Sequence, residues 1–207
     1  MKNSRKKYFF LIIMNILCLH GFRTNMNFMR NVQMQSLFNG LKQHQQHPDL
    51  KINWHFLNGS IATDQIATPD IQKMIEPPYY EWYDGDTHYG LGTSINTITH
   101  YIENHNIHGI LGFSQGACMA SIILHHCPTL RFGIFVCGIN SLHPDYSSMI
   151  NIPSFHIIGN KDPIRHRSLS LFNQFKNGLL QEVPYDHRFP MFQRDYNKLI
   201  EFLIQHS

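Results

Sequence analysis

The chain has 207 residues, of which 43% are hydrophobic and 13% aromatic, so it is long enough to bury the core of one large domain. Charged residues make up only 15% of the chain and the formal net charge is +3, far from the concentrated basic balance that phosphate-backbone binding requires. We therefore expect no nucleic-acid partner.

The N-terminus has some features of a secretory signal peptide. Four basic residues within positions 2–7 precede the apolar run Tyr8 to Leu19. No small-residue cleavage site follows, and the run continues into His20-Gly21-Phe22, which we expect to end the first core strand. We interpret residues 1–13 as a possible extension and residues 14–207 as a single domain. We expect a cytoplasmic protein without a stable membrane span, with the secretory pathway as the alternative if residues 1–19 act as a signal.

The four cysteines give no disulfide framework. They lie in apolar surroundings without a C-x-x-C pair, which is typical of buried thiols in a reducing compartment.

Short apolar runs alternate along the chain with segments of helical periodicity. This alternation predicts βαβ units, and hence an α/β fold with a mostly parallel sheet flanked by helices on both faces. In one run Ile52, Trp54 and Phe56 alternate with polar residues, which indicates a strand near an edge of the sheet. We expect strands at Ile12 to Leu19, Ile52 to Leu57, Gly109 to Phe113, Phe132 to Cys137, Phe155 to Ile158 and Leu180 to Val183.

Helices are predicted between these strands. Apolar residues repeat at helical spacing from Leu91 to Ile102 and from Phe192 to Leu203. Further helices are expected at Asn25 to Gly40, Gln115 to His126 and Ser168 to Asn177.

The stretch from Asn58 to Gly90 has little periodicity and is predicted to be a long functional loop. It carries the aromatic residues Tyr79, Tyr80, Trp82 and Tyr83. Two interpretations are open: these side chains wall an apolar substrate pocket, or they pack the loop.

The pentapeptide Gly112-Phe113-Ser114-Gln115-Gly116 matches the nucleophile elbow G-x-S-x-G. In the α/β-hydrolase fold, this sharp strand-to-helix turn exposes a serine at the end of a buried strand. The context agrees, because an apolar run precedes the motif and an apolar helical segment follows it. We predict that Ser114 is a nucleophile; an ordinary Gly-rich turn is the alternative.

Chain order selects the partners of Ser114 among 15 histidines. In this fold an acid follows a late strand, and the histidine follows the last strand. Asp162 lies in the turn after the strand around Ile157, and His187 lies between the last strand and the C-terminal helix. These positions predict a Ser114, Asp162 and His187 triad.

Two other aspartates are alternatives to Asp162 as the acid. Asp186 is a poor substitute because side chains adjacent in sequence seldom converge on one imidazole, and Asp145 is a weaker alternative.

An oxyanion hole in this fold uses the amide after the nucleophile and a second amide from the loop after an early strand. These criteria predict the backbone N–H groups of Gln115 and Phe22. Gly21 lets the backbone approach a substrate carbonyl closely, and His20 is interpreted as structural. A plain strand-ending turn at His20-Gly21 is the alternative.

No metal or cofactor site is predicted. The groups His44 with His47, His100 with His105 and His108, and His125 with His126 have no supporting carboxylate at a recognised ligand spacing. The sequence also has no Gly-rich phosphate loop of the Walker or dinucleotide type.

The chain resembles the family of serine hydrolases, the FSH group, within the α/β-hydrolase superfamily, over nearly its whole length. The resemblance rests on the order and spacing of five segments: Ile16 to Asn25, Trp82-Tyr83-Asp84, Gly109 to Ala117, His156 to Pro163, and His187-Arg188-Phe189-Pro190.

This resemblance implies that Ser114, Asp162 and His187 form the triad, that Phe22 and Gln115 line the oxyanion hole, and that the substrate is a small acyl ester or thioester. The family usually has glycines before the catalytic histidine, where this chain has Tyr185-Asp186. Asp186 could raise the basicity of the neighbouring imidazole or alter the loop.

Three alternatives stay open at this point. Acyl-protein thioesterases share the Gly-Phe-Ser-Gln-Gly elbow but lack the Trp82-Tyr83-Asp84 and His187 to Pro190 segments. A catalytically silent binding module would keep the fold without the reaction, and a secreted or membrane-anchored hydrolase would depend on the N-terminal segment.

Overall fold

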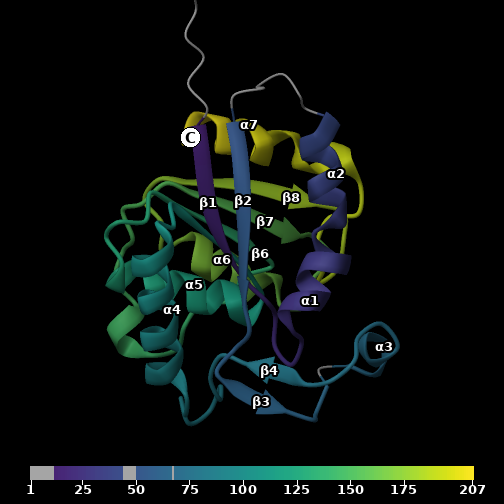
Figure 1. Cartoon of the computed structure of the whole chain (residues 1–207), viewed down its shortest axis with the longest axis vertical. Coiled ribbons are helices and arrows are strands. Elements are labelled where there is room, and N and C mark those ends of the chain that lie inside the picture. Colours follow the sequence, from purple (N-terminus) through teal and green to yellow (C-terminus); the bar gives the residue numbers. More distant parts are fainter. Residues whose placement is uncertain (1–11, 44–49, 67) are drawn as a thin grey trace, which may run out of the picture.

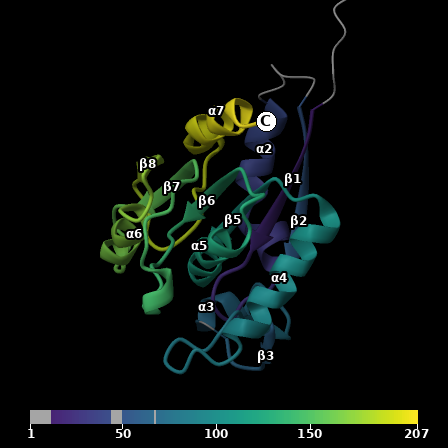
Figure 2. The ribbon, with the colours of Figure 1, turned by 90° about the vertical axis from the view of Figure 1, so that its left-hand side faces the viewer.

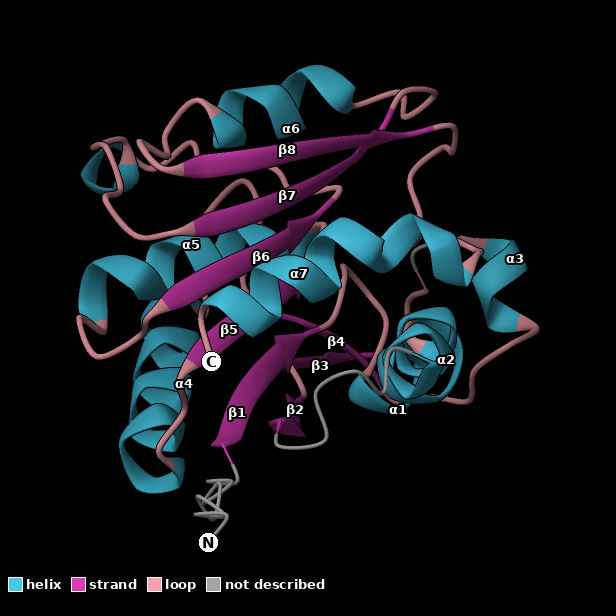
Figure 3. Ribbon diagram, turned by 90° about the horizontal axis from the view of Figure 1, so that it is seen from above, coloured by secondary structure: helices cyan, strands magenta, loops and turns pink. Residues whose placement is uncertain are grey.

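A computed structural model describes residues 12–43, 50–66 and 68–207. Its central feature is a six-stranded sheet with the order β2-β1-β5-β6-β7-β8, seen from above in Figure 3. All neighbouring strands in this sheet are parallel, as predicted. The strands are β1 (Ile12–Leu19), β2 (Leu50–Leu57), β5 (Gly109–Phe113), β6 (Phe132–Val136), β7 (Ser154–Gly159) and β8 (Gly178–Val183).

Helices cover both faces of the sheet, which confirms the predicted layers (Figure 1). One face packs against α4 (Leu91–His105), α5 (Gln115–His126) and α6 (Arg165–Phe172), and Figure 2 shows α4 and α5 side by side. The other face packs against α2 (Gln35–Gln43) and α7 (Asn197–Gln205), and the short helix α1 (Met26–Phe28) precedes α2 in the chain.

Burial follows the position of each strand in the sheet. Every residue of β5 and β6, in the middle of the sheet, is buried. No residue of β2 is fully buried, and β2 is an edge strand, as its alternating sequence predicts. Residues 1–11, which include most of the possible N-terminal extension, lie outside the described residues, so the domain assignment stays a prediction.

The helix expected at Asn25 to Gly40 is not continuous. Asn25 is the N-cap, since its side chain accepts a hydrogen bond from the Phe28 N–H, but a π-helical segment, Met29–Gln33, separates α1 from α2. The Met34 N–H bonds to the Met29 carbonyl at 3.0 Å, one residue farther back than in an α-helix. This extra residue lets Met29 and Met34 lie in the same core cluster.

The helix expected at Ser168 to Asn177 lies closer to the N-terminus than predicted, at Arg165–Phe172. It ends early because Phe175 forms a bridge with Ile150 and so leaves the helical path. The C-terminal helix forms as predicted, preceded by a 3-10 turn, Gln193–Tyr196.

The predicted long loop contains short regular elements. These are β3 (Ile61–Thr63), α3 (Pro69–Gln72) and β4 (Tyr79–Glu81), with β3 and β4 antiparallel. The β3–β4 pair lies beyond the carboxyl ends of β1 and β2 (Figure 1), and Tyr80 forms a bridge with Thr24 after β1. The segment is therefore attached to the edge of the sheet where the predicted site residues follow their strands.

His156 is a histidine held in an aromatic core. Its ring stacks on Phe135 with centroids 4.8 Å apart and meets the edges of Phe172 at 5.2 Å and Phe175 at 4.9 Å. Burial lowers the pKa of His156 to about 3. The unfolded chain therefore binds more protons than the folded chain between pH of about 6.5 and about 3, and stability falls as the pH falls through this window.

We expect His156→Phe to make the protein less sensitive to acid. When the pH is lowered from about 7 to about 5, His156 should reduce the unfolding free energy of the wild type by about 2 kcal/mol. Phenylalanine does not titrate, so the variant should not show this loss. The measurement is urea unfolding at both pH values, with exposed His100→Gln as the control. Equal losses in His156→Phe and in the wild type would contradict the assignment.

Candidate active site

Ser114 occupies a strained turn between β5 and α5. Its backbone angles are φ 54° and ψ −117°, which L-residues rarely adopt. The glycines on either side make the turn possible. A Cβ at Gly112 would lie 2.4 Å from Ala117 Cα, and a Cβ at Gly116 would lie 2.2 Å from the Leu19 carbonyl oxygen. Both contacts are too short for any side chain, so the turn requires glycine at these two positions.

The three residues predicted as a triad lie together. His187 Nε2 is 2.9 Å from Ser114 Oγ, and His187 Nδ1 is 2.7 Å from Asp162 Oδ2. An ionised carboxylate only accepts hydrogen bonds, so Nδ1 carries the proton and Nε2 is free to accept the serine hydroxyl proton. The side chain of Asp162 is fully buried, whereas that of His187 is 27% exposed at the mouth of the site.

The turn after β7 fixes the position of Asp162. Its second carboxylate oxygen, Oδ1, accepts a hydrogen bond from the Ile164 N–H at 2.9 Å. A Cβ at Gly159 would lie 2.4 Å from the carbonyl oxygens of both Tyr185 and Asp186. Glycine at this position therefore lets the chain before His187 pass directly over the turn that carries Asp162.

Neither alternative aspartate occupies this position. Both carboxylate oxygens of Asp186 accept hydrogen bonds from Arg188, and this pairing lowers the pKa of Asp186. The nearby guanidinium offsets the negative charge that Asp186 would otherwise bring to His187. The Asp145 side chain is 75% exposed and lies 3.8 Å from His143.

The loop that carries Phe22 lies against Ser114. A Cβ at Gly21 would be 3.6 Å from Ser114 Cβ and only 2.8 Å from the Phe113 ring. Phe22 follows in an exposed position, and Gln115 begins helix α5. The first N–H groups of a helix have no partner within the helix, which makes them suitable donors to an anion.

The buried imidazole of His20 is uncharged and supports this loop through hydrogen bonds, which is consistent with a structural role. Its Nε2 accepts a hydrogen bond from the Gly59 N–H at 3.0 Å, so the proton lies on Nδ1, which donates to the Gly21 carbonyl at 2.7 Å. Burial lowers the pKa of His20 to about 4, so the ring is neutral near pH 7. Thr24 Oγ1 donates to the same carbonyl at 2.8 Å.

The segment after β4 is tied to the same loop and to the nucleophile turn. Trp82 Nε1 donates to the His20 carbonyl at 2.8 Å. The Gln115 side chain accepts from the Trp82 N–H at 3.0 Å and donates to the Tyr83 carbonyl at 2.7 Å. Gln115 thus holds Trp82 and Tyr83 through its side chain while its backbone N–H lies next to Ser114.

These contacts favour one of the two interpretations of the aromatic group. Trp82 has no exposed surface, so its side chain packs the loop and does not line an open substrate pocket. Tyr79 and Tyr83 are also buried, and the Tyr83 hydroxyl donates to Cys118 Sγ at 3.0 Å. Only Tyr80 among the four contributes to the pocket described next. Sequence patterns do not distinguish these roles, because both require aromatic residues.

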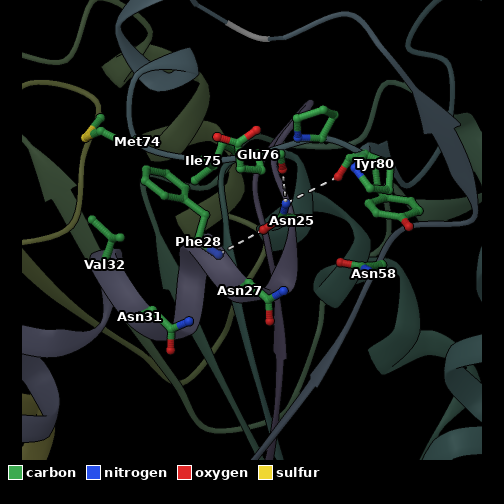
Figure 4. A pocket seen from close by; sticks show the side chains of 12 residues that line it. Asn25, Asn27, Phe28, Asn31, Val32, Asn58, Met74, Ile75, Glu76 and Tyr80 are labelled. Atoms are coloured by element: carbon green, nitrogen blue, oxygen red, sulfur yellow. Dashed lines mark hydrogen bonds between the residues drawn. The ribbon is translucent and has the colours of Figure 1, made fainter.

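A pocket of about 380 Å³ lies beside the loop after β1 (Figure 4). One wall is formed by the first helical turns after Asn25, and the opposite wall by Met74 to Pro78 and Tyr80. Asn58, directly after β2, also lines the pocket. Sequence patterns do not reveal this pocket, because its walls come from three separate segments of the chain.

Among the described residues one group of three potential metal ligands occurs, namely Cys137, Asp162 and His187, whose ligand atoms lie within 4.8 Å of one another. Burial and the nearby Asp162 carboxylate raise the pKa of Cys137 to about 12. The thiol is therefore protonated, and metals bind the thiolate form. Asp162 and His187 are already paired with each other. The group is thus better suited to proton transfer than to metal binding.

The sequence matches the family described as serine hydrolase (FSH1) over residues 12–199. The chain belongs to this family. It is therefore a hydrolase, and its sheet and flanking helices form the α/β-hydrolase fold that the elbow motif predicts.

Relatives agree with this membership, and a solved structure agrees with the fold. Esterase FPY3 of Fusarium mangiferae is 30% identical over 172 residues, which cover 72% of this chain and 75% of that protein. Esterase CG5412 of Drosophila melanogaster is 26% identical over 218 residues, which cover 90% of this chain and 72% of that protein. The crystal structure of esterase PE8 superposes with a TM-score of 0.65 at 17% identity, covering 94% of this chain and 93% of that one.

No helix within residues 12–43, 50–66 and 68–207 is both long and apolar enough to cross a bilayer. The segment that has features of a signal peptide lies largely outside these residues, so the cytoplasmic location stays a prediction.

We expect Trp82→Phe to lower kcat about tenfold with little change in KM. The substitution keeps a buried ring but removes the indole N–H that holds the His20 carbonyl, and with it the loop whose Phe22 N–H we predict in the oxyanion hole. The measurements are the rate of ester hydrolysis and the affinity for an alkyl boronic acid, which mimics the tetrahedral intermediate. Both should fall in Trp82→Phe.

Trp54→Phe is the matched control, because Trp54 is the only other tryptophan and lies on β2 against Phe38. If both variants had the same kcat and the same boronic acid affinity, the indole would have no positioning role.

Proposed function

We propose that the chain hydrolyses carboxylic esters or thioesters of small acyl substrates, with Ser114 as nucleophile, His187 as general base and Asp162 as the acid that orients it. The observation that carries this proposal is the unbroken path of hydrogen bonds, 2.9 Å from Ser114 to His187 and 2.7 Å from His187 to Asp162. Because His187 already lies within hydrogen-bonding distance of both Ser114 and Asp162, little reorganisation precedes proton transfer.

In the first half of the reaction, an acyl-enzyme forms. His187 Nε2 takes the Ser114 hydroxyl proton while Oγ forms a bond to the carbonyl carbon, and the π electron pair moves to the carbonyl oxygen. The N–H groups of Phe22 and Gln115 donate to this oxyanion. The pair then returns, the bond to the leaving oxygen or sulfur breaks, and the leaving group takes the proton from His187.

Water completes the cycle. His187 takes a proton from a water molecule, whose oxygen attacks the acyl carbon, and the same N–H groups hold the second oxyanion. Collapse releases the carboxylic acid and returns the proton to Ser114. Every proton and electron pair moves between substrate, water and these side chains, so the mechanism needs no cofactor.

Asp162 acts through His187. It keeps the proton on Nδ1, so that Nε2 faces Ser114, and it stabilises the imidazolium that forms after proton transfer. Its complete burial strengthens this interaction, because the surrounding dielectric constant is low.

The relatives support the ester half of the proposal, since the matched proteins of Fusarium mangiferae and Drosophila melanogaster are named esterases. A thioester is the second candidate for the scissile bond. It rests on a fold likeness to the RedJ thioesterase of Streptomyces coelicolor, which has a TM-score of 0.56 at 11% identity and covers 94% of this chain and 90% of that one.

We expect a fluorophosphonate probe to label the wild type and Ser148→Ala, but not Ser114→Ala. Ser148 is an exposed serine after β6, which makes it a suitable control. Hydrolysis of p-nitrophenyl esters by Ser114→Ala should fall at least about ten-thousandfold. Labelling and hydrolysis that persist in Ser114→Ala would exclude this nucleophile, and a folded wild type that neither reacts with the probe nor hydrolyses any ester or thioester would indicate a silent binding module.

We expect Asp162→Asn to lower kcat by about 10⁴-fold, because the amide favours the wrong tautomer of His187. Asp186→Asn and Asp145→Asn should each retain kcat within about twofold, since one carboxylate pairs with Arg188 and the other is exposed. Steady-state kinetics on one p-nitrophenyl ester compares all three. A larger loss in Asp186→Asn than in Asp162→Asn would identify a different acid.

A further inference from the structure

The pocket in Figure 4 lies at the carboxyl edge of the sheet, where ligands bind in open α/β folds. It is formed between the segment after β1, the end of β2 and the segment before β4. Its volume of about 380 Å³ is in the range of small-molecule sites. None of Ser114, Asp162 and His187 lines it.

The pocket is within reach of a substrate attached to Ser114. In the sheet order, β2 is two strands away from β5, which carries Ser114, and two strand spacings amount to about 10 Å. Along the chain, Asn25 in the pocket wall is three residues from Phe22, so their Cα atoms are at most about 11 Å apart. A medium-length chain on the carbonyl carbon spans this distance.

The direction of proton transfer indicates that the pocket holds the acyl chain and not the leaving group. The leaving atom must take its proton from His187 Nε2, and His187 follows β8, at the opposite end of the sheet from β2. The oxyanion lies between these sides, at the N–H groups of Phe22 and Gln115. The remaining substituent of the tetrahedral carbon is the acyl chain, which we place toward β1 and β2.

The pocket wall carries no positive charge, and it combines apolar side chains with hydrogen-bonding groups. Among the described residues that line it there is no Lys, Arg or His, and Glu76 supplies a carboxylate. Asn27 and Asn31 present exposed carboxamides from the helical side, opposite Glu76 (Figure 4). A carboxamide both donates and accepts, whereas a carboxylate only accepts, so the pocket favours a neutral donor such as a hydroxyl group.

Asn25 has a different task. Its Oδ1 accepts from the Phe28 N–H at 2.9 Å, and its Nδ2 donates to the Glu76 carbonyl at 3.3 Å and the Pro78 carbonyl at 3.2 Å. These bonds join the two walls of the pocket. Asn25 therefore maintains the shape of the pocket and has little capacity left to bind a ligand.

We propose that this pocket binds the distal end of the acyl group and selects acyl groups that carry a neutral hydroxyl there over those that carry a carboxylate or only hydrocarbon. The hydroxyl bonds to the carboxamide of Asn27 or Asn31, and Glu76 on the opposite wall repels an anionic end. This specificity rests on the proposed function.

The test uses three p-nitrophenyl esters of equal chain length: octanoate, ω-hydroxyoctanoate and the ω-carboxylate, mono-p-nitrophenyl suberate. In the wild type we expect kcat/KM for the hydroxy ester to exceed that for octanoate about fivefold and that for suberate by about tenfold or more. Asn27→Ala with Asn31→Ala should reduce the hydroxy-to-octanoate ratio to about one. Glu76→Gln should reduce the hydroxy-to-suberate ratio about fivefold.

Asn96→Ala, an exposed asparagine on α4, is the control and should keep both ratios. Equal rates for the three esters in the wild type, or ratios that survive in the pocket variants, would overturn the proposal.

Binding separates this proposal from the proposed function. Calorimetry with Ser114→Ala, which leaves the esters intact, should show the same order of affinities and the same loss in Asn27→Ala with Asn31→Ala. If the wild type hydrolysed none of the esters, the proposed function would fall while these affinities still decided the role of the pocket. Equal affinities for all three esters would reject the proposed specificity of the pocket.

Discussion

Helix α5 crosses the end of β1 so closely that a single Cβ at Gly116 would collide with the chain, 2.2 Å from the Leu19 carbonyl oxygen. This contact places the first N–H groups of α5 beside the loop that carries Phe22. Similar close approaches occur at Gly112, against the start of α5, and at Gly159, against the chain before His187. Because packing on all sides determines these positions, the backbone of Ser114 can be held in a conformation that an isolated chain would avoid.

Much of the fold could be predicted from local patterns. The apolar runs predict all six strands of the main sheet, and the alternation of Ile52, Trp54 and Phe56 correctly indicates the edge strand. Ser114, Asp162 and His187 could be selected because each occupies a turn directly after a strand, and the carboxyl ends of parallel strands lie along one edge. The order of residues along the chain singles out His187, whereas the presence of 15 histidines by itself does not identify a base.

Features that depend on distant contacts could not be predicted. The π-helical segment at Met29 arises because two methionines five residues apart share the core, and helix α6 ends early because Phe175 pairs with Ile150. The aromatic composition around Trp82 is compatible with either a pocket wall or a packed loop. The complete burial of Trp82 and the hydrogen bond from its indole to the His20 carbonyl favour the packed loop.

Gln115 serves two parts of the molecule at once, since its backbone lies at the nucleophile turn and its side chain clamps Trp82 and Tyr83. A change in the loop around Trp82 and Tyr83 therefore also reaches the turn that carries Ser114, through the side chain of Gln115. Asn27 and Asn31 lie on the exposed surface of the first helical turns. In the proposed site, substitutions at these two exposed positions would alter the acyl pocket without touching the turn that carries Ser114.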